Sequence, residues 1–201
     1  MPVASDPSIH YWMFNDLVGY SNYALTDQGT GRNYGVDLTI ERFFDKGLFF
    51  LASGSVYKSE YSTDGQNYYS SRYDGRYNSS FMIGKEFEIN GRNMLQFSFR
   101  NLVYGGQWYA SPDDDITART REYYPDPSQV NNRQVDAYWR SDIRISYRKN
   151  NSGNAWMIAL DVQNMFNIEN PRFEIWNIQA NAYDWRNQAG IIPVISYQVD
   201  F

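Results

Sequence analysis

The chain has 201 residues, no cysteine and a single histidine, His10. Without cysteine it can form neither a disulfide framework nor a thiolate metal site. A single histidine also removes most pairs of nucleophile and base, and most zinc sites. We therefore expect no enzyme, no metal site and no cofactor. We interpret His10 as a packed or surface side chain rather than a ligand.

Long apolar runs are absent as well. No stretch approaches the roughly 20 apolar residues of a transmembrane helix. This excludes transmembrane helices but not transmembrane strands, because barrel strands give a weak hydropathy signal. The formal charge of −5 argues against general nucleic-acid binding. The first residues, 1–5, lack the basic start and the apolar core of a signal peptide.

Aromatic residues, in contrast, are abundant. They make up 18% of the chain, and apolar residues make up 42%, although the mean hydropathy is only −0.64. This mixture is typical of strands in which polar and apolar residues alternate. The end of the chain has this pattern, because every second residue is apolar or aromatic: Ile195, Tyr197, Val199 and Phe201. A period of two predicts a strand with one apolar and one wet face.

The same alternation recurs along the chain and predicts about seven antiparallel strands. Their ranges are 32–41, 48–61, 75–89, 95–103, 137–149, 155–163 and 191–201. An eighth strand follows if Arg172 to Ile178 is also extended, and an eight-stranded barrel could then close. Residues 1–31 show no sustained period, so we expect an irregular outer-loop segment there.

The connections between these strands alternate in length. Short turns fall near residues 46, 91 and 152, and long connections cover 62–72, 105–135 and 165–188. In an antiparallel meander, alternate connections lie at opposite ends of the sheet, so all the long loops gather at one end. Transmembrane barrels have this asymmetry, with short periplasmic turns and long outer loops.

Charged residues occupy the wet faces of the predicted strands. Arg140, Asp142, Arg144 and Arg148 share one face of a single strand. A dry core would require partners for these charges, whereas a hydrated lumen accommodates them. The sequence thus predicts an all-β fold in which residues 32–201 form a meander of transmembrane strands. Seven antiparallel strands cannot close on themselves without one parallel seam, so we expect the carboxy-terminal part of a larger outer-membrane β-barrel.

Several segments resemble TonB-dependent outer-membrane receptors of the Bacteroidetes type. The run from Gly29 to Thr39 is similar to a G-x-G-R-N-Y-G entry into a barrel strand. Gly105 to Tyr109 is similar to a Gly-Gly-x-Arg-Tyr segment, although Trp108 stands where arginine is usual. The resemblance continues through 41–44, 55–59, 84–87, 161–167, 190–193 and the final Phe201.

The resemblance implies a 22-stranded barrel with an amino-terminal plug, which imports a scarce ligand with energy from the TonB complex. This chain lacks the plug and the TonB box, so it would not transport alone. The implied location is the outer membrane of a Gram-negative bacterium. The expected partners are outer-membrane lipid, the TonB complex, a surface lipoprotein and the barrel-assembly machinery. That machinery recognises a terminal aromatic strand, here Ile195, Tyr197, Val199 and Phe201.

Aromatic residues of the long loops are candidates for ligand contact by stacking: Trp108, Tyr109, Tyr123, Tyr124 and Trp176. The alternative is that they pack the loops or form an interfacial girdle. The acidic run 113–115 could offer oxygen ligands to a cation, but we favour a solvated loop. Two other functions stay open. One is a complete small barrel with a structural or adhesive role, and the other is a soluble carbohydrate-binding β-sandwich.

Overall fold

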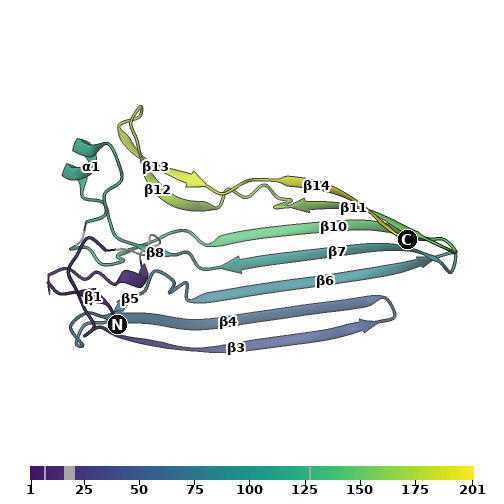
Figure 1. Cartoon of the computed structure of the whole chain (residues 1–201), viewed down its shortest axis with the longest axis horizontal. Helices are drawn as coiled ribbons and strands as arrows, with labels where there is room; N and C mark the ends of the chain where they lie inside the picture. Colours follow the sequence, from purple (N-terminus) through teal and green to yellow (C-terminus); the bar gives the residue numbers. More distant parts are fainter. Residues whose placement is uncertain (7, 16–20, 127) are drawn as a thin grey trace.

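A single antiparallel sheet forms the body of the computed structural model, which describes residues 1–6, 8–15, 21–126 and 128–201 (Figure 1). Seven long strands follow one another in chain order: β3 (Thr30–Asp45), β4 (Leu48–Ser62), β6 (Tyr77–Ile89), β7 (Asn93–Tyr104), β10 (Tyr138–Asn150), β11 (Ala155–Gln163) and β14 (Ile192–Asp200). A short strand, β5 (Tyr69–Ser70), pairs with β4. Each range predicted as a strand overlaps one of the seven, and the antiparallel all-β class is confirmed.

Tight turns join the strands at one end of the sheet. Asn90 and Gly91 both take positive φ, 52° and 67°, as do Lys46 and Gly47, 50° and 75°. Two successive positive φ values give a primed turn, whose twist matches that of the flanking strands. Asparagine and glycine enter this region at little cost, which explains why the chain reverses at 90–91.

The long connections and the start of the chain lie at the other end, which we call the loop end (Figure 1). It carries these short elements: β1 (Val3–Ala4), η1 (Met13–Asn15), β2 (Leu25–Thr26), β8 (Trp108–Tyr109), α1 (Asp114–Thr120), β9 (Arg133–Gln134), β12 (Pro171–Asn177) and β13 (Ala182–Asn187). The segment predicted as irregular, 1–31, contains only two-residue strands and one helical turn before β3, and its residues 7 and 16–20 lie outside the described part.

Two loop regions differ from the sequence expectation. Residues 172–178 do overlap a strand, but β12 pairs with β13 and not with the main sheet, so the eight-stranded barrel is wrong. The acidic run 113–115 begins a helix rather than a solvated loop. Asp113 is the N-cap and accepts a hydrogen bond from the Ile116 amide (2.9 Å), which satisfies a free donor of the first turn.

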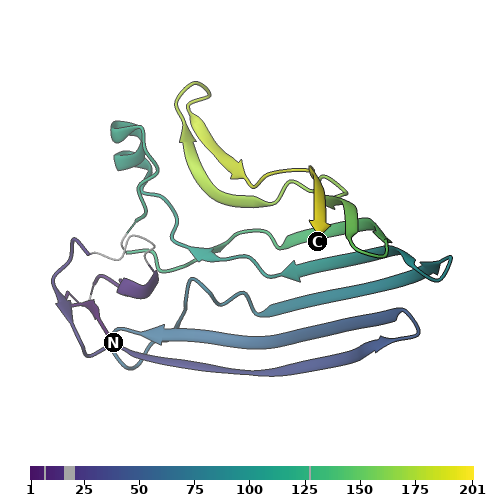
Figure 2. The ribbon, with the colours of Figure 1, turned by 45° about the vertical axis from the view of Figure 1, so that its right-hand side comes forward.

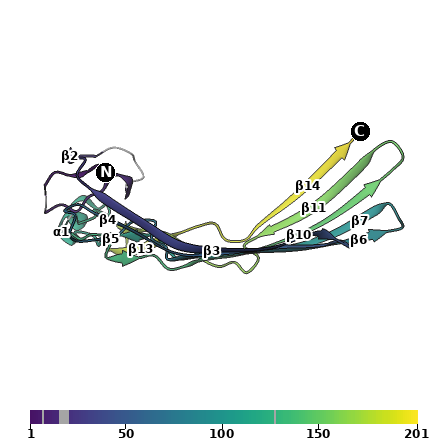
Figure 3. The ribbon, with the colours of Figure 1, turned by 90° about the horizontal axis from the view of Figure 1, so that it is seen from below.

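The two faces of the sheet differ in chemistry because its register keeps like residues in line. One row across four strands contains Phe97, Ile145, Leu160 and Ile195. The next row, on the opposite face, contains Ser98, Arg144 and Asp161. We call these the apolar face and the polar face. The sheet is curved along its strands (Figure 3).

Both edges of the sheet are open in the described chain. β3 pairs only with β4, and β14 pairs only with β11, so the two edge strands do not meet (Figure 2). All 16 residues of β3 are exposed. No described helix is long and apolar enough to span a membrane.

Very little apolar side chain is buried for a chain of this size. Among the described residues, the buried hydrophobic ones are Val3, Ala4, Tyr61, Ala155 and Ala159. On the apolar face, Val36 is 74% exposed, Leu38 64% and Ile195 75%. No described element covers these side chains. A water-soluble domain of similar length would bury most such residues in a core.

Candidate ligand cleft at the loop end

Two adjoining cavities open among the loop-end segments. Cavity A has a volume of about 340 Å³ and cavity B about 330 Å³. They share five lining residues: Tyr11, Asn15, Ala110, Pro125 and Asn131. Together they form one cleft, built from the amino-terminal segment and from the connections that precede β6, β10 and β14. Its residues therefore come from stretches far apart in the sequence.

Aromatic packing holds the amino-terminal wall of cavity A in place. Trp12 stacks on Tyr61 of β4, with ring centroids 5.1 Å apart. Tyr61 is only 2% exposed, and its hydroxyl donates to the carbonyl oxygen of His10 (2.9 Å). The indole Nε1 of Trp12 is buried and has no hydrogen-bond partner among the described residues. His10 is thus a packed side chain that lines this cavity and lies 4.8 Å from the ring of Tyr69.

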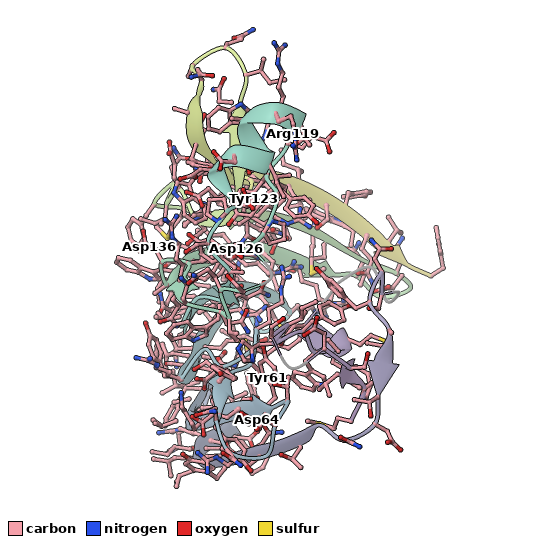
Figure 4. All side chains as sticks on the ribbon, turned by 90° about the vertical axis from the view of Figure 1, so that its left-hand side faces the viewer. Tyr61, Asp64, Arg119, Tyr123, Asp126 and Asp136 are labelled. Carbon is pink, nitrogen blue, oxygen red and sulfur yellow. The ribbon has the colours of Figure 1, made fainter. Side chains whose placement is uncertain are left out.

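Cavity A is lined by rings and by neutral amides. Its side chains include Tyr23, Tyr124, Asn22, Gln129 and the shared Asn131. Among the described residues no lysine or arginine lines it, and the one described carboxylate, Asp126, already accepts hydrogen bonds from the amide and hydroxyl of Ser128 (2.9 and 2.7 Å). Flat rings and amides suit an uncharged ligand with ring faces and hydrogen-bonding groups. Figure 4 views the loop end, with Tyr123 and Asp126 between Arg119 and Tyr61.

Cavity B adds charges to aromatic walls. Trp108, Tyr109, Tyr123 and Phe173 line it together with Arg72, Arg172 and Glu174. The indole of Trp108 donates to the carbonyl oxygen of Asp74 (2.8 Å), and the hydroxyl of Tyr123 donates to that of Ala110 (2.7 Å). These bonds fix the two rings through their polar ends, and the Arg76 guanidinium also contacts the Trp108 ring, with its carbon 5.0 Å from the centroid.

Arg72 is held in position before any ligand arrives. Its backbone amide donates to Asn15 Oδ1 (2.8 Å), and its guanidinium donates to Gln107 Oε1 (3.1 Å) and to the carbonyl oxygen of Asn15 (3.3 Å). These two side-chain bonds use two of the five guanidinium N–H groups. Arg172, on β12, lies with its guanidinium carbon 5.6 Å from the ring centroid of Phe173.

Glu174 is the one carboxylate that lines cavity B in the part of the chain that the structure describes. Arg133 lies 3.5 Å from it, a long distance for an ion pair. Burial raises the pKa of Glu174, and Arg133 opposes this rise only in part. Burial also raises the pKa of Tyr109 and of Tyr123, and the charge of Glu174 adds to the rise. Both phenols therefore remain neutral donors near neutral pH.

A third cavity connects the cleft with the strands. Cavity C, of about 420 Å³, shares Arg72, Gln107, Val135, Arg172 and Phe173 with cavity B. Its far wall includes Tyr104 of β7 and Tyr138 of β10, whose stacked rings have centroids 4.5 Å apart. Tyr138 lies two residues before Arg140, so both belong to the polar face.

Ion pairs continue along the polar face from this point. Arg140 pairs with Asp142 (2.7 Å), Arg144 with Asp161 (2.7 Å) and Arg148 with Asp200 (2.8 Å). Arg100 of β7 lies opposite Asp142 and makes no ion pair among the described residues. The polar face is thus lined with fixed charges over the length of the sheet.

The structure brings together most of the aromatic residues proposed for ligand contact. Trp108, Tyr109 and Tyr123 line cavity B, and Tyr124 lines cavity A. Trp176 lines none of cavities A, B and C and packs against Tyr183, with centroids 5.0 Å apart. The terminal series Ile195, Tyr197, Val199 and Phe201 is exposed on the apolar face and at the chain end.

The sequence interpretation did not identify Tyr11, Asn15, Arg72, Arg172 or Glu174 as site residues. They come from segments without a regular period, where no local motif marks them. No group of three or more His, Asp or Glu side chains that could hold a metal ion occurs in the described ranges. The cleft offers rings, amides and guanidiniums, groups that can contact a ligand by stacking and by hydrogen bonds.

Comparisons of the chain with protein-family models, with curated proteins and with solved structures find no match.

Proposed function

We propose that this chain is the carboxy-terminal barrel segment of a TonB-dependent outer-membrane transporter that imports a scarce ligand. In this proposal the apolar face contacts lipid, the polar face lines a hydrated bore, and the loop-end cleft meets the ligand outside the cell. The plug, the TonB complex, a surface lipoprotein and the barrel-assembly machinery are its partners.

The observation that carries the proposal is the uncovered apolar face. An isoleucine or leucine left in water forfeits about 1.5–3 kcal/mol of burial free energy. Dozens of large hydrophobic side chains are exposed on this chain, among them Val36, Leu38 and Ile195. In hydrocarbon this cost disappears. The shortest of the seven strands have 9 residues, and about 9–11 tilted residues cross a bilayer.

The polar face and the open edges support the same proposal. Fixed ion pairs such as Arg144–Asp161 suit the hydrated interior of a transmembrane barrel. The free edges of β3 and β14 fit strands of a larger barrel, because unpaired strand edges are not tolerated within hydrocarbon.

The two alternative functions lack a structural element in the described residues. A small complete barrel requires β3 and β14 to pair, and they do not. A β-sandwich requires a second sheet on the apolar face, and the other sheets are two-stranded hairpins or bridges outside that face. We therefore prefer the transporter segment.

The absence of cysteine allows a direct test. Single cysteines placed along β3 are labelled with a nitroxide in protein reconstituted into lipid vesicles, and collision with oxygen and with a water-soluble nickel complex is measured. We expect frequent collisions with oxygen, which is enriched in lipid, for labels on the apolar face: Tyr34, Val36, Leu38 and Ile40. We expect frequent collisions with the nickel complex for labels on the polar face: Asn33, Asp37, Thr39 and Glu41. Water accessibility at both sets of positions, or a folded monodisperse chain in plain buffer, contradicts the proposal.

A further inference from the structure

Arg72 and Arg172 meet in the loop-end cleft although they are 100 positions apart in the sequence. Both line cavity B and both line cavity C, so they stand where the two cavities adjoin. Neither forms an ion pair with any described carboxylate, whereas Arg133, Arg140, Arg144 and Arg148 each do. Two unpaired guanidiniums on one cleft favour an anion between them.

The carboxylates near Arg72 and Arg172 do not neutralise the positive charge of this part of the cleft. Glu174 in cavity B lies 3.5 Å from Arg133, which is a further positive charge. Among the described residues, Asp136 is the carboxylate that lines cavity C. The same two guanidiniums line both cavities, so Arg72 and Arg172 face Glu174 and Asp136, and Arg133 adds a third guanidinium beside Glu174. Burial disfavours the charged form of Glu174, so the described charges around the junction have a positive excess although the whole chain carries −5.

The geometry of Arg72 also favours a carboxylate. Asn15 and Gln107 hold its guanidinium through two hydrogen bonds and leave other N–H groups for a ligand. A planar guanidinium binds a carboxylate through two parallel bonds, and charge-assisted bonds of this kind are about twice as strong as neutral ones. Because Arg72 is already ordered, little side-chain entropy is lost on binding.

We propose that the cleft binds an elongated organic acid, with an uncharged ring-containing body in cavity A and a carboxylate held by Arg72 and Arg172 at the junction of cavities B and C. Amides and rings of cavity A contact the body. Arg100 lies further along the polar face, opposite Asp142, and adds a positive charge to the path of an anion. As a substrate class for import, this inference rests on the proposed transporter function.

The test compares each acid with its neutral partner by titration calorimetry of the chain in lipid nanodiscs, with empty nanodiscs as reference. One pair is 3-phenylpropionate and 3-phenylpropanamide, and the other is glucuronate and glucose. We expect the acid of at least one pair to bind about tenfold tighter than its neutral partner, and high salt to reduce the difference. The preferred pair tells whether the body is an aryl group or a sugar.

Single substitutions locate the preference. Arg172→Gln, at an exposed position, should reduce the preference for the acid to less than about threefold and leave the affinity for the neutral partner unchanged. Arg172→Lys should retain most of the preference for the acid. Arg119→Gln is the matched control, because Arg119 is exposed on α1 and lines none of the three cavities. Equal binding of acid and neutral partner, binding of neither, or a preference that survives Arg72→Gln/Arg172→Gln overturns the inference.

The same titration separates this inference from the transporter proposal. If the chain folds in plain buffer, the titration is run there. An acid preference in a water-soluble chain supports the cleft and contradicts only the membrane function. A chain whose β3 labels alternate between lipid and water, but which shows no acid preference, contradicts only the anion site.

Discussion

The loop end and the strands of this chain bury different atoms. Of the largest fully buried side chains, all but Ser141 belong to the loop end or to the last two residues of β4. They are Tyr61, Val3, Thr117, Asp74, Ser62 and Ser71. The strands satisfy their backbone through the ladder, yet leave Val36, Leu38 and Ile195 exposed. The loop end is thus packed as a small protein is packed in water, whereas the sheet lacks a covering layer. Loops and strands should respond differently to substitution.

The largest effect is expected at Asp74, which is fully buried at the loop end. It accepts hydrogen bonds from Lys58 Nζ (2.6 Å), Ser59 N (2.8 Å) and Ser70 Oγ (2.8 Å). Asp74→Ala should lower the free energy of unfolding by about 3–5 kcal/mol, because three donors lose their buried acceptor and the Lys58 ammonium keeps only the longer contact with Glu60 (3.6 Å). Urea unfolding in nanodiscs measures this loss. Asp64→Ala, at an exposed turn of the same connection, is the control and should cost less.

The same carboxylate gives a pH dependence. Burial alone would raise the pKa of Asp74, but hydrogen bonds from Lys58, Ser59 and Ser70 outweigh it and lower the pKa. Its contribution to stability is therefore complete above the unfolded pKa of about 4 and is lost as the pH falls through the lower folded value. In Asp74→Ala, the free energy of unfolding should no longer show this loss at low pH. If its dependence on pH below about 4 is the same as in the wild type, Asp74 is not the group responsible.

The next effect separates the two faces of the sheet. Leu38 and Thr39 are adjacent and exposed at the middle of β3, on the apolar and the polar face respectively. In lipid, Leu38→Arg should cost about 2–4 kcal/mol and Thr39→Arg about 0–1 kcal/mol. In water, both surface substitutions would stay within about 0.5 kcal/mol. Equal costs in vesicles would mean that the apolar face does not meet hydrocarbon.

A smaller effect is expected where β11 ends. Asn164 has a positive φ of 50°, and its side chain bonds both the amide and the carbonyl of Ile168 (3.0 and 2.9 Å). Asn164→Ala should cost about 2 kcal/mol, from lost hydrogen bonds and a left-handed backbone that alanine disfavours. Asn164→Gly loses the same bonds but tolerates the backbone, so it should be about 1 kcal/mol milder. Thermal unfolding of the two variants checks this order.

The strands were predictable because a period of two is a local signal. Most residues of β10 indicate their face by their own polarity, with Ser141 and Lys149 as exceptions on the apolar face, and the Asn90–Gly91 pair by itself predicts a tight turn. Helix α1 was missed because seven residues carry no apolar period, although the Asp113 N-cap was a usable signal. β13 was missed because it has only six residues within a long polar connection, although Tyr183 and Trp185 alternate with Asp184 and Arg186.

The cleft was predictable only in part. Aromatic loop residues such as Trp108 and Tyr123 attract notice by their type alone. Arg72 and Arg172 do not, because their significance arises from the fold bringing two distant connections together. That neither arginine has an ion-pair partner among the described residues is likewise a property of the folded chain, and no sequence pattern predicts it.

The smallest effect concerns Glu174, where the cleft and the β12–β13 hairpin meet. Burial raises its pKa, so its ionised form opposes folding above the folded pKa, and stability is regained as the pH falls through that value. This is the opposite sense to Asp74. Glu174→Gln should change stability at neutral pH by less than about 1 kcal/mol, because the contact with Arg133 is long and the Arg133 side chain is about half exposed. Hydrogen exchange of the hairpin between pH 4 and 7 measures the change. The wild-type hairpin should become better protected from exchange as the pH falls, and the variant should not. Protonation of Glu174 would then stabilise the loop end, whereas protonation of Asp74 destabilises it.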